Sequence, residues 1–479
     1  MPPDPATTDL DGQSSPTTPY LDGPFAPIDT EITAEQLPVR GQLPRDLQGV
    51  FIRNGANPKF RPAGRHHWFD GDGMLHGLYL SDGAATYRNR YVRTSGLASD
   101  EAAGSALTGG ILEPPDVQRV GGPYKNTGNT DIVYHDGKLL ALWWLGGAAH
   151  QVRVEDLVTI GEYTFGGALQ RGIASHPKID PVTGEMMFFD YALQPPFMYY
   201  GVVDRQGNVS HQIPVELPGP RLQHDMAITR NYTILFDFPL YWDPRLLAHG
   251  KTRVVFNPEL PSRFGVLPRY GTSEEVRWFE APACYMYHTI NAYEEGDALT
   301  LLGCSIRNPI AAERSAPQQW PRLDIIELEP YLTQWRFDLS AGTVSDTILD
   351  DVPTEFPRMN DGWHTQLARY SYNPRIARTA GLLFDGLIKY DLQSGTSEAL
   401  DYDPGTFGGE TVFAPRPNTQ DEDDGYLLTF VTDGTEKCSE LWITDAREVS
   451  TGPVARVQIP QRVPIGYHAC WIPAERITA

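Results

Sequence analysis

Residues 283–297 read Ala-Cys-Tyr-Met-Tyr-His-Thr-Ile-Asn-Ala-Tyr-Glu-Glu-Gly-Asp, a run that predicts one β-strand ending in a turn. From Cys284 to Tyr293 the residues are β-branched, aromatic or apolar with few interruptions, as is typical of a strand. Glu-Glu-Gly-Asp then supplies turn chemistry. His288 lies in the middle of this strand. A single histidine in such a place is more often a core residue with a satisfied hydrogen bond than a metal ligand.

Three further segments place a histidine in a similar setting and change the interpretation of His288. His176 precedes a hairpin-like Asp-Pro-Val-Thr-Gly turn, and His224 leads into an expected strand over 232–238. His468 lies in Gly-Tyr-His-Ala-Cys-Trp near the C-terminus. These four histidines can converge on one metal ion. Four neutral imidazoles suit a non-haem Fe(II) with open positions for O2, and on ligand type alone they suit copper or zinc as well.

Two glutamates are candidate acceptors for the second ring N–H that metal-bound histidines usually donate to a carboxylate. Glu355 lies in Pro-Thr-Glu-Phe-Pro-Arg-Met-Asn, and Glu410 lies in Gly-Gly-Glu-Thr-Val-Phe. Both acids stand beside apolar residues, where an unpaired carboxylate is costly. The alternative for each is a partly exposed loop acid with no role at a metal.

The composition excludes several classes of function. The 479 residues carry a net charge of −22 with a pI near 4.9, so no nucleic-acid partner is expected, because phosphate binding needs a basic face. The same charge opposes docking on anionic membranes. The 4 cysteines lie far apart without a Cys-x-x-Cys, which favours reduced thiols in a cytoplasmic protein over disulfides or a zinc site. Neither a signal peptide nor an apolar run of about 18 residues that could span a membrane is expected.

The organisation of the chain indicates many short strands. Residues 1–19 are mostly Pro, Asp, Ser and Thr, which predicts a disordered tail before a single domain over 20–479. Asp-Gly and similar turns punctuate short apolar runs throughout, and the best helix candidate is short, at 244–249. A weak repeat recurs in which a strand end is followed by Asp, a few residues, Gly and a new strand. The sequence therefore predicts an all-β propeller, with an array of β-sandwiches as the alternative.

A set of motifs occurs in a fixed order in the first third of the chain. Gly-Val-Phe-Ile-Arg-Asn-Gly-Ala-Asn-Pro at 49–58 precedes His-Trp-Phe-Asp-Gly-Asp-Gly-Met-Leu-His at 67–76. Tyr-Arg-Asn-Arg-Tyr-Val-Arg-Thr at 87–94 and Asn-Thr-Gly-Asn-Thr at 126–130 follow. With the four histidines, this order resembles the carotenoid cleavage oxygenase family over about residues 20–474. The resemblance implies a seven-bladed β-propeller with a dome of loops and short helices over an axial Fe(II).

The resemblance also implies roles for single residues. The family holds Fe(II) by four histidines, which are matched here by His176, His224, His288 and His468. Glu355 and Glu410 match the glutamates that support His288 and His468, and Thr130 matches the threonine whose methyl group crowds one open iron position. The implied reaction is cleavage of a conjugated C=C bond by O2, which gives two carbonyl fragments. Candidates for lining an apolar substrate tunnel are the aromatic residues Phe69, Trp143, Trp144 and Tyr287.

Three functions remain open on the sequence alone. The first is an apocarotenoid or carotenoid dioxygenase, the second is an aryl-alkene dioxygenase of the same family that cleaves stilbenes or phenylpropenes, and the third is a catalytically silent propeller that binds a ligand. The third is disfavoured because all four histidine positions are filled. Stilbene-cleaving members resemble one another in carrying a lysine where this chain has Trp143. The indole offers an apolar face to a polyene, so the sequence favours the first function.

Trp144 departs from the family pattern, because the family usually has a glutamate there that supports the histidine matched by His224. An indole has one N–H and no acceptor, so it cannot accept the imidazole proton. We therefore expect two carboxylate-supported histidines and a third, His224, that is held by a backbone carbonyl or a water or is left unsupported.

The segment from Gly104 to Pro115 is the expected rim of the tunnel mouth. It is only modestly apolar, with Leu107, Ile111 and Leu112. Contact with a membrane is therefore expected to be weak and peripheral at most.

Overall fold

The computed structural model describes residues 18–116, 123–243, 254–310, 320–434 and 438–477. Residues 1–17 of the expected tail and the expected short helix at 244–249 lie outside these residues. The described chain begins with two 3-10 helices, η1 (Pro19–Leu21) and η2 (Gly23–Phe25).

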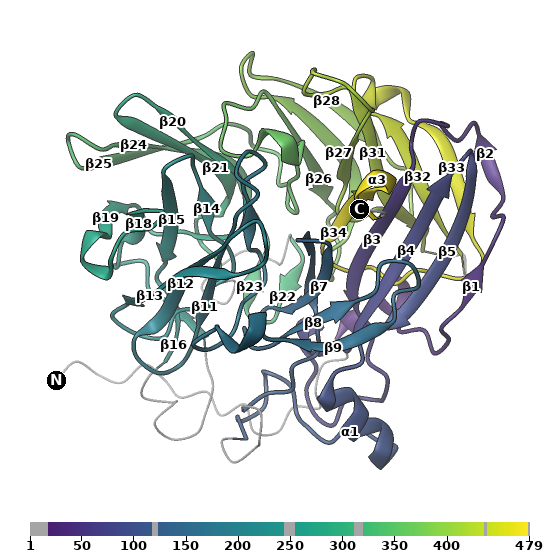
Figure 1. The fold of residues 1–479 in the computed structure, drawn as a ribbon, viewed down its shortest axis with the longest axis horizontal. Helices are drawn as coiled ribbons and strands as arrows, with labels where there is room; N and C mark the ends of the chain where they lie inside the picture. The colour runs from purple at the N-terminus through teal and green to yellow at the C-terminus, as the bar shows by residue number, and fades with distance from the viewer. Residues whose placement is uncertain (1–17, 117–122, 244–253, 311–319, 435–437, 478–479) are drawn as a thin grey trace.

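Strands dominate the described chain, and seven antiparallel sheets stand around a common axis as propeller blades (Figure 1). The first blade consists of β6 (Thr130–His135), β7 (Lys138–Trp143), β8 (Ala149–Val152) and β9 (Thr159–Tyr163), and the second of β10 (Lys178–Ile179), β11 (Met186–Tyr191), β12 (Phe197–Val203) and β13 (Val209–Glu216). The third consists of β14 (Ala227–Ile228), β15 (Tyr232–Asp237), β18 (Ser262–Pro268) and β19 (Arg277–Ala281). The fourth consists of β20 (Tyr285–Glu295), β21 (Ala298–Ile306), β24 (Tyr331–Asp338) and β25 (Thr343–Ile348), and the fifth of β26 (Tyr370–Ile376), β27 (Phe384–Asp391) and β28 (Thr396–Asp401).

The last two blades combine strands from both ends of the chain. The sixth consists of β29 (Thr406–Phe407), β30 (Val412–Pro415), β31 (Gly425–Asp433), β32 (Ser439–Asp445), β33 (Pro453–Ile459) and the N-terminal β2 (Val39–Gly41). The seventh consists of β34 (Ala469–Pro473), β3 (Gly49–Ala56), β4 (Gly73–Ser81), β5 (Ala84–Tyr91) and β1 (Thr33–Ala34). The C-terminal strand β34 pairs with β3 antiparallel, from Arg53 opposite Ala469 to Gly49 opposite Pro473. This pairing closes the ring of blades, because the two ends of the chain hold each other by backbone hydrogen bonds.

The burial of the strands explains their sequences. Every residue of β11 is buried, and its sequence Met-Met-Phe-Phe-Asp-Tyr is almost continuously apolar, since neighbouring blades cover both of its faces. The outer strand β25 reads Thr-Val-Ser-Asp-Thr-Ile and is mostly exposed, with polar residues interleaved. The hydrophobic pattern thus changes from nearly continuous in the covered strand β11 to interrupted by polar residues in the outer strand β25.

Two hairpins and most of the helices lie outside the blades. β16 (Leu240–Trp242) pairs with β17 (Val254–Phe256), and β22 (Arg322–Leu323) pairs with β23 (Ile326–Glu327). The helices are α1 (Ser95–Ala103), α3 (Ala474–Ile477), η3 (Trp68–Asp70), η4 (Phe165–Gly167), η5 (Ser273–Glu275), η7 (Asp361–Trp363) and η8 (Val449–Thr451). In the part of the chain that the structure describes, none of these helices combines the length and the apolar composition that crossing a bilayer requires.

Helix α1 was not expected from the sequence. Its residues, Ser-Gly-Leu-Ala-Ser-Asp-Glu-Ala-Ala, show no apolar stripe, and the structure defines the helix by its two ends. At the start, the Thr94 hydroxyl accepts a hydrogen bond of 3.1 Å from the Leu97 N–H. At the end, Gly104 adopts the left-handed conformation with φ 69° that commonly terminates helices.

Candidate metal centre

The inner ends of the blades converge on the axis, and each blade contributes one side chain there. In blade order these are Thr130 at the start of β6, His176 before β10, His224 before β14, His288 within β20, Glu355 in the segment bridged to β26, Glu410 before β30, and His468 before β34. Side chains that are almost 340 positions apart in the sequence thus meet, because each blade places its inner end at a similar distance from the axis.

Four of these side chains are histidines whose ring nitrogens face one another. One nitrogen from each ring lies within 4.8 Å of the others, and all four side chains are buried. The Nε2 atoms of His224 and His288 are 3.2 Å apart, and the ring centres of His176 and His468 are 4.4 Å apart. Burial, reinforced by the neighbouring histidines, holds the pKa of His176, His224 and His288 well below the usual histidine range. These rings are neutral, which is the form that binds a metal ion.

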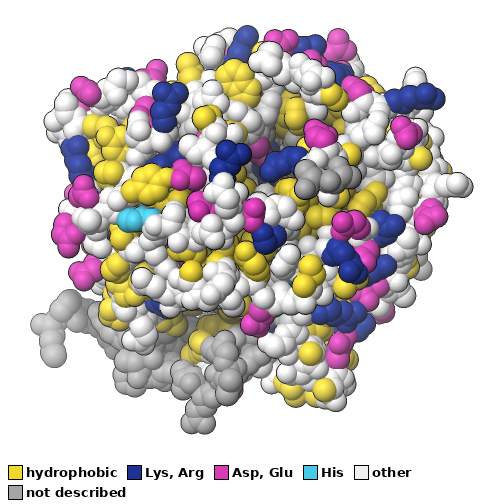
Figure 2. Space-filling view, in the orientation of Figure 1, with side chains coloured by type: hydrophobic (Ala, Val, Ile, Leu, Met, Phe, Trp, Pro, Cys, Tyr) yellow, Lys and Arg dark blue, Asp and Glu magenta, His cyan; other side chains and the backbone are white. Residues whose placement is uncertain are grey.

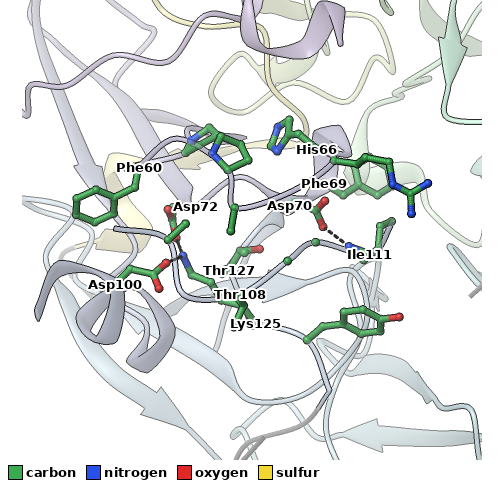
Figure 3. Close-up of a pocket in the computed structure, with 18 of the residues that line it drawn as sticks. Phe60, His66, Phe69, Asp70, Asp72, Asp100, Thr108, Ile111, Lys125 and Thr127 are labelled. Carbon is green, nitrogen blue, oxygen red and sulfur yellow. Dashed lines mark hydrogen bonds and ion pairs between the residues drawn. The ribbon is translucent and has the colours of Figure 1, made fainter. Parts of the chain in front are cut away.

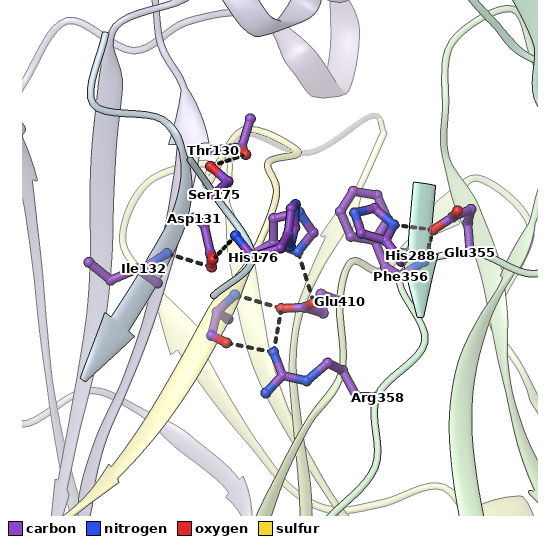
Figure 4. Close-up of polar contacts among 12 residues, drawn as sticks. Thr130, Asp131, Ile132, Ser175, His176, His288, Glu355, Phe356, Arg358 and Glu410 are labelled. Atoms are coloured by element: carbon purple, nitrogen blue, oxygen red, sulfur yellow. Dashed lines mark hydrogen bonds and ion pairs between the residues drawn. The ribbon is translucent and has the colours of Figure 1, made fainter. Parts of the chain in front are cut away.

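The local backbone explains how two of the rings reach the axis. His176 has φ 67°, in the left-handed region, and its N–H donates a hydrogen bond of 2.9 Å to Asp131 Oδ2 (Figure 4). The register of β20 against β21 shifts between Met286 and Thr289, on either side of His288. A bulge of this kind re-aims a side chain out of the regular alternation of a strand.

Glu410 supports His468 as an anion. Its Oε1 lies 3.0 Å from His468 Nδ1, and its Oε2 accepts a 2.5 Å hydrogen bond from the Ala469 N–H and a 3.4 Å hydrogen bond from Arg358 Nη1. Burial alone would raise the pKa of Glu410, but Arg358 and these donors bring it below its usual range. Figure 4 shows Arg358 reaching Glu410 from the side away from the rings.

Glu355 supports His288 in a different electrostatic environment. Its Oε2 lies 2.5 Å from His288 Nδ1 and also accepts a hydrogen bond from the Phe356 N–H, whereas Oε1 is buried without a partner among the described residues. Burial raises the pKa of Glu355 to about 8. A cation bound among the imidazoles would favour the carboxylate form, because it supplies the positive charge that Arg358 supplies to Glu410.

The structure places no carboxylate at the ring of His224 among the described residues. Among these residues, the one polar contact of that ring is between Nε2 and His288 Nε2. Trp144 turns its indole toward Phe69, with the ring centres 5.1 Å apart, and its buried Nε1 has no hydrogen-bond partner among the described residues. Phe69 in turn stacks on the His224 ring at 5.9 Å. Aromatic packing thus occupies the place where the family usually has a glutamate.

His224 is instead positioned through its neighbour, a feature that the sequence did not indicate. Asp225 is 2% exposed, and its Oδ2 accepts hydrogen bonds from the Thr289 N–H at 2.7 Å and the Thr289 hydroxyl at 2.8 Å. Its Oδ1 pairs with Lys178 Nζ at 2.7 Å. Thr289 follows His288, and Lys178 lies two residues after His176. One carboxylate therefore ties together three of the segments that carry histidines.

These residues fit a divalent metal ion. The donor set is four neutral imidazoles, two of which have carboxylate acceptors for their second nitrogen. His176 Nε2 is buried without a hydrogen-bond partner among the described residues, and a metal ion would satisfy it.

An apolar pocket lies against the rings on the side covered by η3 and the hairpin β22–β23, which we call the dome. It is small, about 20 Å³, and Phe69, Tyr287 and Thr130 line it together with Trp68, Leu323, Leu328, Leu382, Phe356 and Tyr467. The Tyr287 ring meets His224 edge-on at 4.8 Å. Of the residues that the sequence suggested for a tunnel, Phe69 and Tyr287 are at the metal side, whereas Trp143 lines a separate cavity of the dome.

The dome cavity is bounded by η3, the segment at 106–111 and the chain before β6 (Figure 3). In this view His66 and Phe69 lie above it, and Thr127 and Lys125 lie below it. Phe69 also lines the apolar pocket, so one ring forms a wall of both spaces. Within the expected rim at 104–115, Leu107 is 58% exposed, whereas Ile111 is buried and faces this cavity.

Comparison with known proteins relates this chain to several dioxygenases. A family model described as retinal pigment epithelial membrane protein matches residues 25–473. A carotenoid 9,10(9',10')-cleavage dioxygenase of Crocus sativus is 37% identical, with 96% of this chain and 90% of the relative covered. An isoeugenol monooxygenase of Pseudomonas nitroreducens is 31% identical, with 95% of this chain and 98% of the relative covered.

Solved structures agree with this match. A lignostilbene dioxygenase of Pseudomonas brassicacearum superimposes with a TM-score of 0.88 at 29% identity, covering 96% of this chain and 99% of the other. A variant of the Synechocystis apocarotenoid oxygenase superimposes with a TM-score of 0.81 at 27% identity, covering 94% and 97%. The fold and centre thus define a metal-dependent dioxygenase on a seven-bladed propeller. The chain belongs to the carotenoid cleavage oxygenase family.

Replacement of any one of the four histidines by alanine is expected to strip the metal or abolish cleavage, because each supplies one of only four protein ligands. Metal content and product formation are measured on the purified His176→Ala, His224→Ala, His288→Ala and His468→Ala proteins. His211→Ala is the matched control, since that ring contacts the Gly271 carbonyl at 3.0 Å away from the centre. A full metal content with full activity in any of the four would contradict the ligand assignment.

Asp225→Asn is expected to weaken metal binding roughly tenfold, because partners that orient metal ligands typically contribute 10–100-fold to affinity. The amide cannot accept from Thr289 and pair with Lys178 with the same charge. The dissociation constant for Co²⁺ and the visible spectrum of the cobalt protein are measured, together with thermal stability. Asp237→Asn is the matched control, because Asp237 is also 2% exposed and paired with arginines but lies in β15. Equal loss of stability in both variants with unchanged cobalt affinity would show that Asp225 serves only the fold.

Proposed function

We propose that the protein is a non-haem Fe(II) dioxygenase that cleaves a conjugated C=C bond of an apocarotenoid or carotenoid with O2 to give two carbonyl products. The observation that carries this proposal is the apolar pocket directly against a buried four-histidine centre. When bound, the iron supplies the site at which O2 binds and is activated. The alkene and O2 together hold all atoms of the two carbonyl products, so no further reactant is required.

The chain's own residues position the alkene and exclude water. Phe69 and Tyr287 stand beside His224, and their rings can pack on the faces of a flat conjugated chain. Thr130 lines the same pocket, and its hydroxyl donates to Ser175 Oγ at 3.2 Å, which fixes the orientation of its methyl group. The one acid in the pocket lining, Glu355, is engaged with His288. The proposed role of Thr130 is therefore steric, limiting how the alkene and O2 approach the centre.

The dome cavity supports a substrate with one polar end. His66 Nε2 and Thr127 Oγ1 line it and are buried without hydrogen-bond partners among the described residues. Burial lowers the pKa of His66 to about 4, so its ring is neutral and suits an uncharged carbonyl or hydroxyl. Lys125 pairs with both Asp72 and Asp100, so these two carboxylates of the cavity share one cationic partner. An apocarotenoid carries such a terminal oxygen, and a hydrocarbon carotene does not.

An aryl alkene is the second candidate, because the lignostilbene dioxygenase has the higher of the two TM-scores. The same polar end would then receive a phenol. Against this candidate, Trp143 lines the dome cavity where stilbene-cleaving members of the family carry a lysine. The indole carries no positive charge to pair with a phenolate, so Trp143 favours the polyene substrate.

The substrate is tested by incubating the iron-loaded protein separately with an apocarotenal and with a hydroxystilbene, then identifying the aldehydes formed. We expect cleavage of the apocarotenal, with kcat/KM at least about tenfold above that for the stilbene, since one well-placed contact contributes about 1.4 kcal/mol or more. Trp143→Lys should shift this ratio toward the stilbene, and Trp143→Phe is the matched control that keeps the apolar face. Aldehydes from the stilbene alone would establish the second candidate, and no product from either substrate would overturn the dioxygenase proposal.

We also propose a cytoplasmic protein with at most weak, peripheral lipid contact. Cys284, Cys304 and Cys470 form no disulfide, which suits a reducing compartment, and on the face in Figure 2 apolar side chains are scattered among acidic and basic ones. Leu107 is the exposed apolar side chain of the expected rim.

Most of the protein should stay in the supernatant after sedimentation with zwitterionic liposomes at high salt. Tight co-sedimentation there would contradict weak contact, because salt removes only the electrostatic part of binding.

A further inference from the structure

A second cavity, distinct from the apolar pocket, also reaches the histidines. It has a volume of about 440 Å³, and its lining includes His176, His288 and His468 at its buried end. At its other end the lining residues Asp361 and Arg476 are exposed, so the cavity opens to solvent. The buried, unpartnered His176 Nε2 belongs to a residue that lines this cavity and not the apolar pocket.

The walls of this axial cavity are polar and acidic. Its lining contains the carboxylates of Asp131, Asp180, Asp225, Asp361 and Glu410, against the cationic side chains of Lys178, Arg358 and Arg476. Lys178 pairs with Asp225, Arg358 pairs with both Asp361 and Glu410, and the Arg476 guanidinium lies over the Tyr134 ring. Asp180 pairs with Arg269 from outside the lining, so the five carboxylates face four cations and the cavity keeps one excess negative charge, which favours the entry of a cation.

The apolar pocket presents the opposite environment. Its described lining offers aromatic and aliphatic side chains, and its single carboxyl group, Glu355, is bonded to His288. A hydrated dication that enters such a space loses water ligands without gaining oxygen donors, at a cost of several kcal/mol or more. The axial cavity instead offers carboxylate oxygens along its length, which can replace water one ligand at a time.

We propose that the axial cavity is the route by which the divalent metal ion enters and leaves the four-histidine centre, while the apolar pocket serves the organic substrate. This inference rests on the proposed function, because it takes the four histidines as the metal ligands. Asp361 acts at the mouth by attracting the cation. His176 also lines this cavity, and its Nε2 has no hydrogen bond among the described residues that an entering ion would have to displace.

The route is tested by the kinetics of metal exchange on the full-length protein. Metal-free protein is mixed with Co²⁺ in a stopped-flow instrument, uptake is followed by visible absorbance, and loss is followed after mixing the cobalt protein with excess chelator. Asp361→Lys should slow uptake roughly tenfold at low ionic strength, with the difference shrinking at high salt, because steering by charge is screened. The end point should remain one ion per chain. Glu274→Lys, at an exposed acid outside the cavity, is the control with the same change in net charge.

A steric variant and a substrate-side blocker separate the two routes. A Cβ added to Gly362, which lines the exposed end, meets only Asn360 Oδ1, at 3.2 Å, so a small shift of that side chain admits the Cβ, and Gly362→Trp should slow both uptake and loss. Saturation of the apolar pocket with trans-stilbene should leave both rates unchanged. The proposal is overturned if stilbene slows exchange while Asp361→Lys and Gly362→Trp do not. Absence of any cobalt end point in the unsubstituted protein would instead overturn the metal site itself, and with it the proposed function.

Discussion

The antiparallel pairing of β34 with β3 is the constraint on which the centre depends. Five of the seven axial side chains come from blades formed in sequence order, but His468 stands immediately before β34 and reaches the axis only when that strand is paired. The fourth ligand is thus fixed by the pairing of the following strand with residues more than 400 positions away, and Glu410 is bonded to that ligand. The position of His468 at the axis and the closure of the ring of blades therefore depend on the same strand pairing.

The two carboxylates that support histidines are both buried and both contact a histidine Nδ1, but their charge environments differ. Glu410 accepts from two N–H donors of the protein and from His468, and Arg358 keeps it ionised without a metal. Glu355 has a raised pKa and a buried, unpartnered Oε1, so its charge balance is completed only by a cation at the rings. The protein itself thus supplies the cation that keeps Glu410 ionised, whereas the ionisation of Glu355 depends on the metal that the centre holds.

The sequence allowed the blade architecture and the converging histidines to be predicted, because both rest on local patterns. Strand runs, Asp-Gly turns and the setting of His288 are readable over a few residues. The residues that fix these ligands were missed, because their partners are distant: Asp131 holds the backbone of His176, and Asp225 joins Lys178 to Thr289. Each stands in an ordinary polar context with no spacing rule. Helix α1 was missed for another reason, since its caps and not an apolar stripe define it.

Trp144 stands where the family pattern has a glutamate that supports His224. Distant contacts position His224 in place of that carboxylate. An indole packs on Phe69, and Phe69 stacks on His224, so the ring is held on its apolar side by aromatic contacts. On its polar side the backbone is held through Asp225, which is bonded to the strand of His288 and to Lys178. The ring nitrogen itself gains no acceptor, so the exchange preserves the position of His224 while giving up the increase in basicity that a carboxylate confers.

The whole centre has an apolar side and a polar side, as His224 does. An alkene substrate requires walls that exclude water, whereas a dication requires oxygen and nitrogen donors wherever it travels. A single opening cannot satisfy both demands. The propeller axis separates them, because the dome covers one end of the inner strands with Trp68, Phe69 and Tyr287, while the other end leaves Asp131, Asp225 and Asp361 facing an open cavity. The histidines lie between the two environments, and His288 and His468 line both.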